Sequence, residues 1–198
     1  MFLLAVTLKT MFFEYPWPLV AAVWVTALFL FFLARSRADK RLFRSAVTAF
    51  SLGLVIIILS LTVTTENETV KARTKAFVAT TAPLDIKQFN TFIEPFAAVV
   101  GPNGDTWITY DQLQTILPNL HKYFYFDSQY TTVPHTESMR TGNIATTVIV
   151  RTKIGEGYTF KSEWTLLWKK DPAGNWKVVE IRFDKLQNKP PTKGVWNV

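Results

Sequence analysis

Two long stretches without a charged residue occupy most of the first third of the chain. They read WPLVAAVWVTALFLFFLA over residues 17–34 and SAVTAFSLGLVIIILSLTV over residues 45–63. As α-helices, at ~1.5 Å per residue, each would be roughly 27–29 Å long, about the thickness of the hydrocarbon core of a bilayer. Buried core helices rarely run this far without one charge. The sequence therefore predicts two membrane spans, and the bilayer is the first predicted partner.

Basic residues are concentrated between these two stretches. The segment RSRADKRLFR, residues 35–44, contains five Lys or Arg residues and a single acidic residue, Asp39. Short loops rich in Lys and Arg usually stay on the cytoplasmic side. We therefore expect an integral protein of the cell membrane, with a cytoplasmic basic loop over residues 35–44 and an extracytoplasmic chain after about residue 64.

The formal net charge of +7 belongs in large part to this anchor. Six of the 22 basic residues and only two of the 15 acidic residues precede residue 65. Most of the basic excess is therefore explained by membrane topology, and the sequence predicts no nucleic-acid partner. The chain has no cysteine, which excludes disulfides, thiol catalysis and Cys-ligated zinc.

Residues 65–186 have the pattern of a water-exposed domain, and residues 187–198 form a C-terminal tail. Apolar residues at helical spacing predict helices over residues 65–80 and 85–94. A third helix is predicted over residues 112–124, capped by Asp111, after a short strand near residues 107–110.

Beyond residue 123 the apolar period changes to two, which predicts strands near residues 124–132, 143–154, 158–170 and 175–185. A three-residue turn at Gly155-Glu156-Gly157 places Ile154 opposite Tyr158, so that Val148 pairs with Trp164. The predicted fold class is α+β, with about three helices packed on one face of a curved antiparallel sheet of four strands.

The last hairpin closes through Asp171-Pro172-Ala173-Gly174. If residues 171–174 form a four-residue loop, Trp164 faces Ile181 on the apolar side. On the opposite side Glu163 then faces Arg182, and Lys161 faces Asp184. Opposite charges across neighbouring strands stabilise a sheet by roughly 0.2–1 kcal/mol per pair.

The order of elements resembles the nuclear transport factor 2-like cone fold, also described as SnoaL-like or ketosteroid isomerase-like. The resemblance rests on the helix over residues 65–80, on Leu84-Asp85-Ile86 at the start of the second helix, and on the last hairpin, where Trp176-Lys177-Val178-Val179 follows the turn. It covers residues 65 to about 186. Such folds include isomerases, cyclases and dehydratases as well as non-catalytic domains, so the resemblance implies a fold and leaves the function open.

Few side chains are suited to acid/base catalysis inside such a cone. On the predicted inner face of the last three strands only Tyr158 is ionisable, and Asp127 and His135 are the other candidates. The chain has two histidines, His121 and His135, without carboxylates at metal-binding spacing, and no glycine-rich phosphate loop. The sequence thus predicts no metal and no cofactor.

An aromatic pocket is the second prediction for the cone. The chain contains 16 Phe and 7 Trp. The residues expected to line an apolar pocket are Phe77, Phe89, Phe92, Tyr110, Tyr158, Phe160 and Trp164. Ordinary core packing explains the same residues, and the sequence does not separate the two roles.

These observations favour a membrane-anchored, extracytoplasmic and non-catalytic domain that binds a small apolar ligand or a protein partner, with a homodimer through the sheet as one form of partner. The alternative is an isomerase-like or cyclase-like enzyme that uses Asp127, His135 and Tyr158. A further alternative resembles the bridging subunits of type IV secretion systems, which usually have one span, whereas this chain has two.

Overall fold

The computed structural model describes residues 17–123, 126–139, 141–154 and 158–196, and the side chains within these ranges except those of residues 120–127 and 195–196. The chain divides into two compact units, Met1–Glu66 and Asn67–Val198. Each unit is described by itself below.

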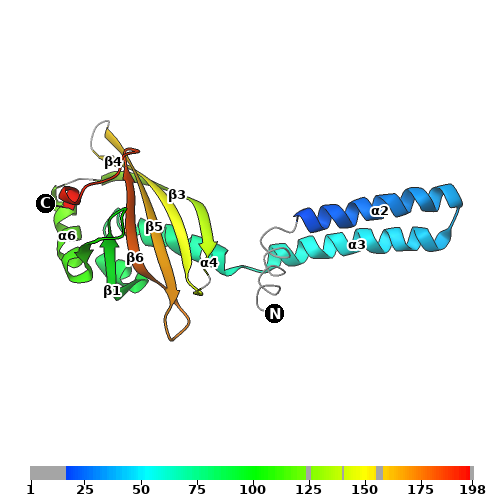
Figure 1. Ribbon diagram of the computed structural model, residues 1–198, viewed down its shortest axis with the longest axis horizontal. Coiled ribbons are helices and arrows are strands. Elements are labelled where there is room, and N and C mark those ends of the chain that lie inside the picture. Colours follow the sequence, from blue (N-terminus) through cyan, green and yellow to red (C-terminus); the bar gives the residue numbers. More distant parts are fainter. Residues whose placement is uncertain (1–16, 124–125, 140, 155–157, 197–198) are drawn as a thin grey trace. The chain divides into compact units, whose positions relative to one another are not determined.

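The first unit is a hairpin of two helices, α2 (Trp17–Arg37) and α3 (Lys40–Thr62) (Figure 1). Only Ala38 and Asp39 separate them. Asp39 caps α3, because its Oδ1 accepts a hydrogen bond from the backbone N–H of Arg41 at 2.7 Å. The predicted loop over residues 35–44 is therefore wrong: its basic residues belong to the last turn of α2 and to the first turns of α3, because Lys and Arg are good helix formers.

Small residues let the two helices approach each other closely. Val20, Ala27 and Ala34 are buried in α2 at a spacing of seven residues, and Ala46 and Gly53 are buried in α3 at the same spacing. Gly53 lies against the indole ring of Trp24, where a β-carbon would collide with it. That indole also stacks on Phe50, with ring centroids 5.5 Å apart.

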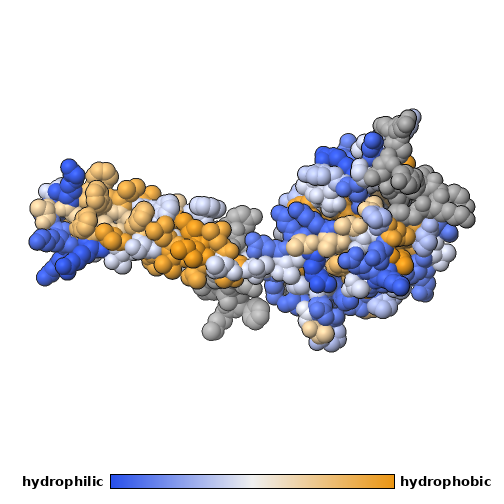
Figure 2. All heavy atoms as spheres, turned by 180° about the vertical axis from the view of Figure 1, so that it is seen from behind, coloured by the Kyte–Doolittle hydropathy of each residue, from blue (hydrophilic) through white to orange (hydrophobic). Residues whose placement is uncertain are grey.

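The outer surface of the hairpin is apolar. Figure 2 shows orange spheres along the two helices, with a hydrophilic end where the basic residues gather. The exposed residues include Val25, Leu28, Phe29, Phe32, Leu52, Val55, Ile58 and Leu61. By length and composition, both helices are able to cross a membrane.

The second unit packs helices on a mixed six-stranded sheet (Figure 1). Its elements are α4 (Glu66–Ala79), α5 (Ile86–Phe92), β1 (Ile93–Val100), β2 (Thr106–Thr109), α6 (Tyr110–Tyr123), β3 (Phe126–Ser138), β4 (Ile144–Ile154), β5 (Tyr158–Lys170), β6 (Trp176–Leu186) and the short 3₁₀ helix η2 (Lys193–Trp196). The strand order is β2-β1-β6-β5-β4-β3, with β1 parallel to β6. The predicted α+β class is confirmed.

The predicted antiparallel sheet of four strands is wrong, because β1 and β2 extend the sheet beyond β6 and β1 runs parallel to β6. The second helix ends at Phe92 rather than at residue 94, and the chain continues directly as β1. Pro95 has no N–H to donate, and the pairing of β1 with β6 is interrupted between Ile93 and Ala98. Burial does not alternate regularly along IEPFAAVV, so a search for alternating apolar residues misses this strand.

The start of α6 also differs from the prediction that Asp111 caps it. Thr109 and Gln112 form a reciprocal cap, since the backbone N–H of Thr109 donates to Gln112 Oε1 at 3.0 Å and that of Gln112 donates to Thr109 Oγ1 at 3.5 Å. Asp111 lies in the first turn of the helix instead. A Thr-x-x-Gln pair satisfies two backbone donors at once, which a single Asp cannot do.

A buried polar chain fixes α4 to the sheet. The Oγ1 atoms of Thr74 and Thr146 are 3.1 Å apart, and Trp168 Nε1 donates to Thr146 Oγ1 at 3.1 Å. All three side chains are completely buried. Phe77, one turn further along α4, packs its ring against Phe89 with centroids 5.0 Å apart. These contacts hold the helices against one face of the sheet.

The hairpin of β4 and β5 has the predicted register. Ile154 pairs with Tyr158, Val148 with Trp164 and Val150 with Ser162, and the ladder is regular along its length. The turn residues 155–157 lie outside the described part of the chain.

The register predicted for β5 and β6 is wrong. The loop has five residues rather than the predicted four, because Lys170 pairs with Trp176. Further along, Trp164 pairs with Phe183 rather than Ile181, and Leu166 pairs with Ile181. The ladder is irregular at two places, where Val179 and Asp184 each stand as an extra residue in β6. Such β-bulges bend and twist a strand, and they shift every later pair along it.

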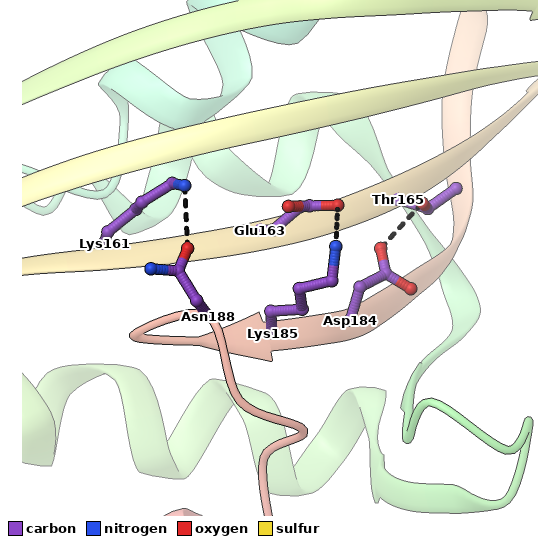
Figure 3. A network of polar contacts seen from close by, with 6 residues as sticks. All are labelled: Lys161, Glu163, Thr165, Asp184, Lys185 and Asn188. Carbon is purple, nitrogen blue, oxygen red and sulfur yellow. Dashed lines mark hydrogen bonds and ion pairs between the residues drawn. The ribbon is translucent and has the colours of Figure 1, made fainter.

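The shift replaces the two predicted charge pairs with other polar contacts (Figure 3). Glu163 forms an ion pair with Lys185, with 3.1 Å between Oε1 and Nζ, and Thr165 Oγ1 donates to Asp184 Oδ2 at 2.7 Å. Lys161 Nζ donates to Asn188 Oδ1 at 2.9 Å. Arg182, predicted to face Glu163, contacts Glu180 at 2.7 Å instead.

Candidate functional site

A cavity of about 240 Å³ lies between the sheet and three helices. Strands β1, β3, β4, β5 and β6 form one side, and α4, α5 and α6 form the other. Its lining residues are Phe77, Val78, Thr81, Phe89, Val99, Leu113, Leu117, Gln129, Val148, Val150, Thr152, Ser162, Trp164, Leu166 and Ile181. Eleven of these fifteen are apolar or aromatic, and the other four are neutral and polar.

The strand registers order the lining into rows. Leu166 pairs with Ile181 at one end, and Val148 pairs with Trp164 in the middle. Gln129 pairs with Thr152 at the other end. The exposed fraction of alternate residues on β5 increases in the same direction, from 2% at Leu166 to 39% at Phe160 and 73% at Tyr158. The cavity is therefore apolar at its closed end and polar at its more open end.

Hydrogen bonds fix the polar side chains of the lining. Ser162 Oγ accepts a bond from Trp164 Nε1 at 2.8 Å. The single hydroxyl proton of Thr81 points to the backbone oxygen of Val78 at 2.7 Å, so Thr81 Oγ1 accepts from Gln129 Nε2 at 3.3 Å. The carbonyl oxygen of Gln129 also lies 3.4 Å from Thr81 Oγ1, and the second N–H of its amide is not used in these bonds.

Trp164 is held as a wall of the cavity on its other face as well. Its ring stacks on that of Phe183, with centroids 4.0 Å apart and an interplanar angle of 5°. Trp168, four residues further along β5, is completely buried in the core. The two tryptophans of one strand thus have different environments: one packs on all sides, and the other borders a cavity.

The structure brings together three of the seven residues predicted to line a pocket: Phe77, Phe89 and Trp164. Phe92 is buried in the core, and Tyr110 packs partly buried against it. Phe160 is exposed in the same row as Gln129 and Thr152, since it pairs with Thr152, and Tyr158 is exposed one row beyond it. These last four residues are not part of the cavity lining.

The candidate catalytic residues do not form a group within the described part of the chain. The side chains of Asp127 and His121 lie outside the described residues. His135 is exposed on the edge strand β3, where its Nε2 is 3.5 Å from Glu137 Oε2. It pairs with Thr147, on the sheet face opposite to the one that carries Val148. Tyr158 is exposed at the start of β5.

Among the described residues of the second unit, two carboxyl groups have a shifted pKa, and neither lines the cavity. Burial raises the pKa of Asp184, and the hydrogen bond from Thr165 and the nearby Arg182 guanidinium partly offset this. The backbone N–H of Asn175 lowers the pKa of Asp171 in the β5–β6 turn. Among the described residues no cluster of three or more His, Asp or Glu side chains is placed to hold a metal ion.

Sequence reasoning missed the polar residues of the lining, Thr81, Gln129, Thr152 and Ser162. The sequence does not determine which side chains of β3 point toward the helices, because the consecutive aromatic residues near its start suit either face of the sheet. Alternation on the confirmed β4–β5 ladder does place Thr152 and Ser162 on the inner side, so part of the signal was present.

No protein-family model matches this sequence, and no curated protein matches it either. Among solved structures, the chain is similar to a domain of unknown function with a cystatin-like fold from Nostoc punctiforme. That likeness has 12% sequence identity and a TM-score of 0.51, and it covers 68% of this chain and 85% of the other.

Two further structures share part of the architecture. One is a ketosteroid isomerase-like protein from Erwinia carotovora, at 13% identity and a TM-score of 0.49, covering 61% of this chain and 95% of the other. The second is ActVI-ORFA from Streptomyces coelicolor, at 11% identity and a TM-score of 0.48, covering 62% and 95%. At such identities the likeness concerns the fold alone, and it agrees with the cone fold predicted from the sequence.

Proposed function

We propose that this protein is a membrane-anchored, non-catalytic domain that binds a small apolar ligand in the cavity of its cone. The observation that carries the proposal is the cavity itself, about 240 Å³ in volume and lined mainly by apolar side chains. An apolar protein cavity of ~150 Å³ is already large enough to bind benzene. Removing a larger apolar ligand from water into such a cavity is favourable by roughly 25 cal/mol per Å² of apolar surface buried.

The lining is preorganised for binding rather than filled by its own side chains. Trp164 is fixed by its hydrogen bond to Ser162 and by its stacking on Phe183. Rigid walls lower the entropy cost of binding, because few rotamers have to be ordered when the ligand enters. Ordinary core packing would instead bury Trp164 as completely as Trp168.

The proposed anchor consists of α2 and α3. Both helices are long and apolar enough to span a bilayer, and the five basic residues over residues 35–44 favour a cytoplasmic connection. Under this topology the second unit is extracytoplasmic. An apolar ligand partitions into the bilayer, so a binding domain tethered to the membrane operates where its ligand is most concentrated.

Ligand extraction tests the binding proposal. The full chain is purified in native lipid nanodiscs, and molecules that co-purify with it are identified by mass spectrometry. A Val150→Phe variant, which adds volume inside the cavity, is compared with Thr147→Val, a change on the opposite face of β4. We expect an apolar molecule to be enriched with the parent chain and with Thr147→Val and to be lost with Val150→Phe. Equal recovery from all three proteins would contradict the proposal.

The same preparation separates binding from catalysis. The recovered molecule is incubated with the parent chain and with Asp127→Asn and His135→Ala variants. A non-catalytic binder should return it chemically unchanged from all three. Conversion by the parent that one of these variants abolishes would contradict the non-catalytic role and favour an isomerase-like or cyclase-like enzyme.

Single cysteines test the topology, and the chain offers a clean background because it contains none. A cysteine introduced between residues 35 and 44 should be protected from an impermeant thiol reagent in intact cells, and one at Asn188 should be labelled. The reverse pattern would contradict the proposed orientation.

A further inference from the structure

We infer that the ligand is a neutral amphiphile, whose apolar body fills the closed end of the cavity and whose carbonyl or hydroxyl group hydrogen-bonds to Gln129 beside Thr152. This inference rests on the proposed binding function and specifies the chemistry of the ligand. It depends on the order in which the lining residues follow one another along the sheet.

The lining has a polarity gradient along the strands. At the closed end lie Leu166 and Ile181, with Phe89 contributed by α5. At the other end the row of Gln129 and Thr152 is joined by Thr81, which follows α4. A uniformly apolar molecule would leave these polar groups desolvated without a partner, which costs about 1–3 kcal/mol for each buried group. A molecule with one polar end matches both ends of the cavity.

Gln129 has the hydrogen-bonding capacity for this role. One of its N–H groups donates to Thr81 Oγ1 at 3.3 Å, and the short bond from Thr81 to the Val78 carbonyl consumes the only hydroxyl proton of Thr81. The remaining N–H of Gln129 suits a ligand carbonyl, and its own carbonyl oxygen suits a ligand hydroxyl. The bond to Thr81 orients the amide, so that binding does not have to order it.

The four polar side chains of the lining are neutral, and this favours a neutral polar group on the ligand. Burying an ionised carboxylate or amine is very costly unless a charged partner compensates it. A neutral carbonyl needs only the single hydrogen bond that Gln129 offers. The polar end also lies toward the exposed Phe160, where the cavity is more open, so the apolar body would enter first.

Three naphthalene probes test this inference. They are nearly equal in size and differ only in the substituent at one ring position. They are acetylnaphthalene, which carries a ketone, isopropylnaphthalene, which replaces it with a hydrocarbon, and naphthoate, which carries a charge. Binding to the full chain in nanodiscs is followed through the NMR resonance of the Trp164 indole N–H, a reporter inside the cavity. Each probe also partitions into the lipid, but to the same extent for every protein variant. This partitioning therefore cancels when the dissociation constant of a variant is divided by that of the parent.

Gln129→Leu should weaken ketone binding by about three- to tenfold, the loss expected for one buried hydrogen bond, and should leave binding of the hydrocarbon unchanged or stronger. Thr152→Val, which keeps the shape and removes a hydroxyl, should act in the same direction with a smaller effect. Thr147→Val on the opposite face is the matched control and should change neither affinity.

The outcomes separate the inference from the proposed function. If the hydrocarbon binds and Gln129→Leu weakens neither probe, the polar recognition is overturned and the apolar cavity stands. Tighter binding of naphthoate than of the ketone overturns the inference of a neutral ligand. If no probe shifts the Trp164 resonance, both the inference and the proposed binding function are overturned.

Discussion

The two strand ladders that share β5 differ in regularity. On one side β4 pairs with β5 without interruption from Ile144 to Ile154. On the other side β6 accommodates extra residues at Val179 and Asp184. A bulge bends its strand and increases the local twist, so the bulged ladder curves the sheet while the regular ladder extends it. Because Ile181 lies between the two bulges and lines the cavity, the irregular ladder helps to shape the site.

The difference also redistributes charge on the outer face of the sheet. A four-residue turn without bulges would place Glu163 opposite Arg182, but the ladder starts with Lys170 opposite Trp176, and its two bulges bring Lys185 to Glu163 (Figure 3). Asp184, itself a bulge residue, is held by the hydroxyl of Thr165. Regular alternation can thus predict which face a residue is on while failing to identify its neighbour.

The largest expected effect compares two tryptophans on the strand that both ladders share. Trp168→Ala should lower the free energy of unfolding by about 3–5 kcal/mol, because it removes a completely buried ring and its hydrogen bond to Thr146. Trp164→Ala should lower it by roughly 1–3 kcal/mol, because this ring borders a cavity. Chemical denaturation followed by far-ultraviolet circular dichroism measures both. Equal losses would mean that Trp164 is packed as tightly as the core.

A second prediction concerns the turn from which the bulged ladder starts. Gly174 has a φ of 86°, in the left-handed region that suits glycine. Gly174→Ala should therefore cost about 1 kcal/mol of stability. Gly194→Ala is the control, since its φ is not positive and only the Thr192 hydroxyl oxygen lies within 4 Å of the added β-carbon. Thermal denaturation measures the change in Tm caused by each substitution. Equal changes would show that a side chain at position 174 does not strain the turn.

The register of the bulged ladder can be measured directly with double-mutant cycles. The pair Glu163 and Lys185 should show a coupling energy of about 0.2–1 kcal/mol, as expected for a partly exposed ion pair. The pair Glu163 and Arg182 should show almost none. Neutral Gln replacements at each position provide the cycles. Coupling of Glu163 to Arg182 alone would contradict the observed register and support the one predicted from the sequence.

The smallest expected effect is a pH dependence at the second bulge. Burial raises the pKa of Asp184 in the folded protein above its ordinary value of 3.8, so ionisation of this group opposes folding. The penalty is fully present above the folded-state pKa and disappears as the pH falls below 3.8. Asp184→Asn should therefore be slightly more stable than the parent at neutral pH, with the difference shrinking as the solution is acidified. A series of Tm measurements at decreasing pH checks this, and a gap that widens on acidification would contradict it.

Much of the architecture was predictable because it depends on local patterns. The two charge-free stretches, residues 17–34 and 45–63, indicated the two long helices. Alternation along β4 and β5, together with a short glycine turn, gave the correct pairing of Val148 with Trp164. Aromatic residues at helical spacing identified Phe77 and Phe89 as inward-facing, and both line the cavity.

The strand β1 depended on contacts far apart in the sequence. It pairs in parallel with β6, so that Val99 lies beside Ile181. Pro95 breaks the local alternation, and the turn over residues 101–105 joins β1 only to the short strand β2. Only the packing of the complete unit decides that this segment extends the sheet instead of continuing α5.

The cavity shows the same division between sequence and tertiary structure. Apolar alternation by itself determined which face of β5 and β6 points inward, because side chains on a strand alternate with a period of two. It could not determine the offset, which differs from the prediction by one residue where Lys170 pairs with Trp176, by two at Trp164 and by three at Glu163. Two bulges and the pairing of Gln129 with Thr152 decide where the polar end of the cavity lies, and these follow from tertiary packing because no local sequence pattern marks the position of a bulge.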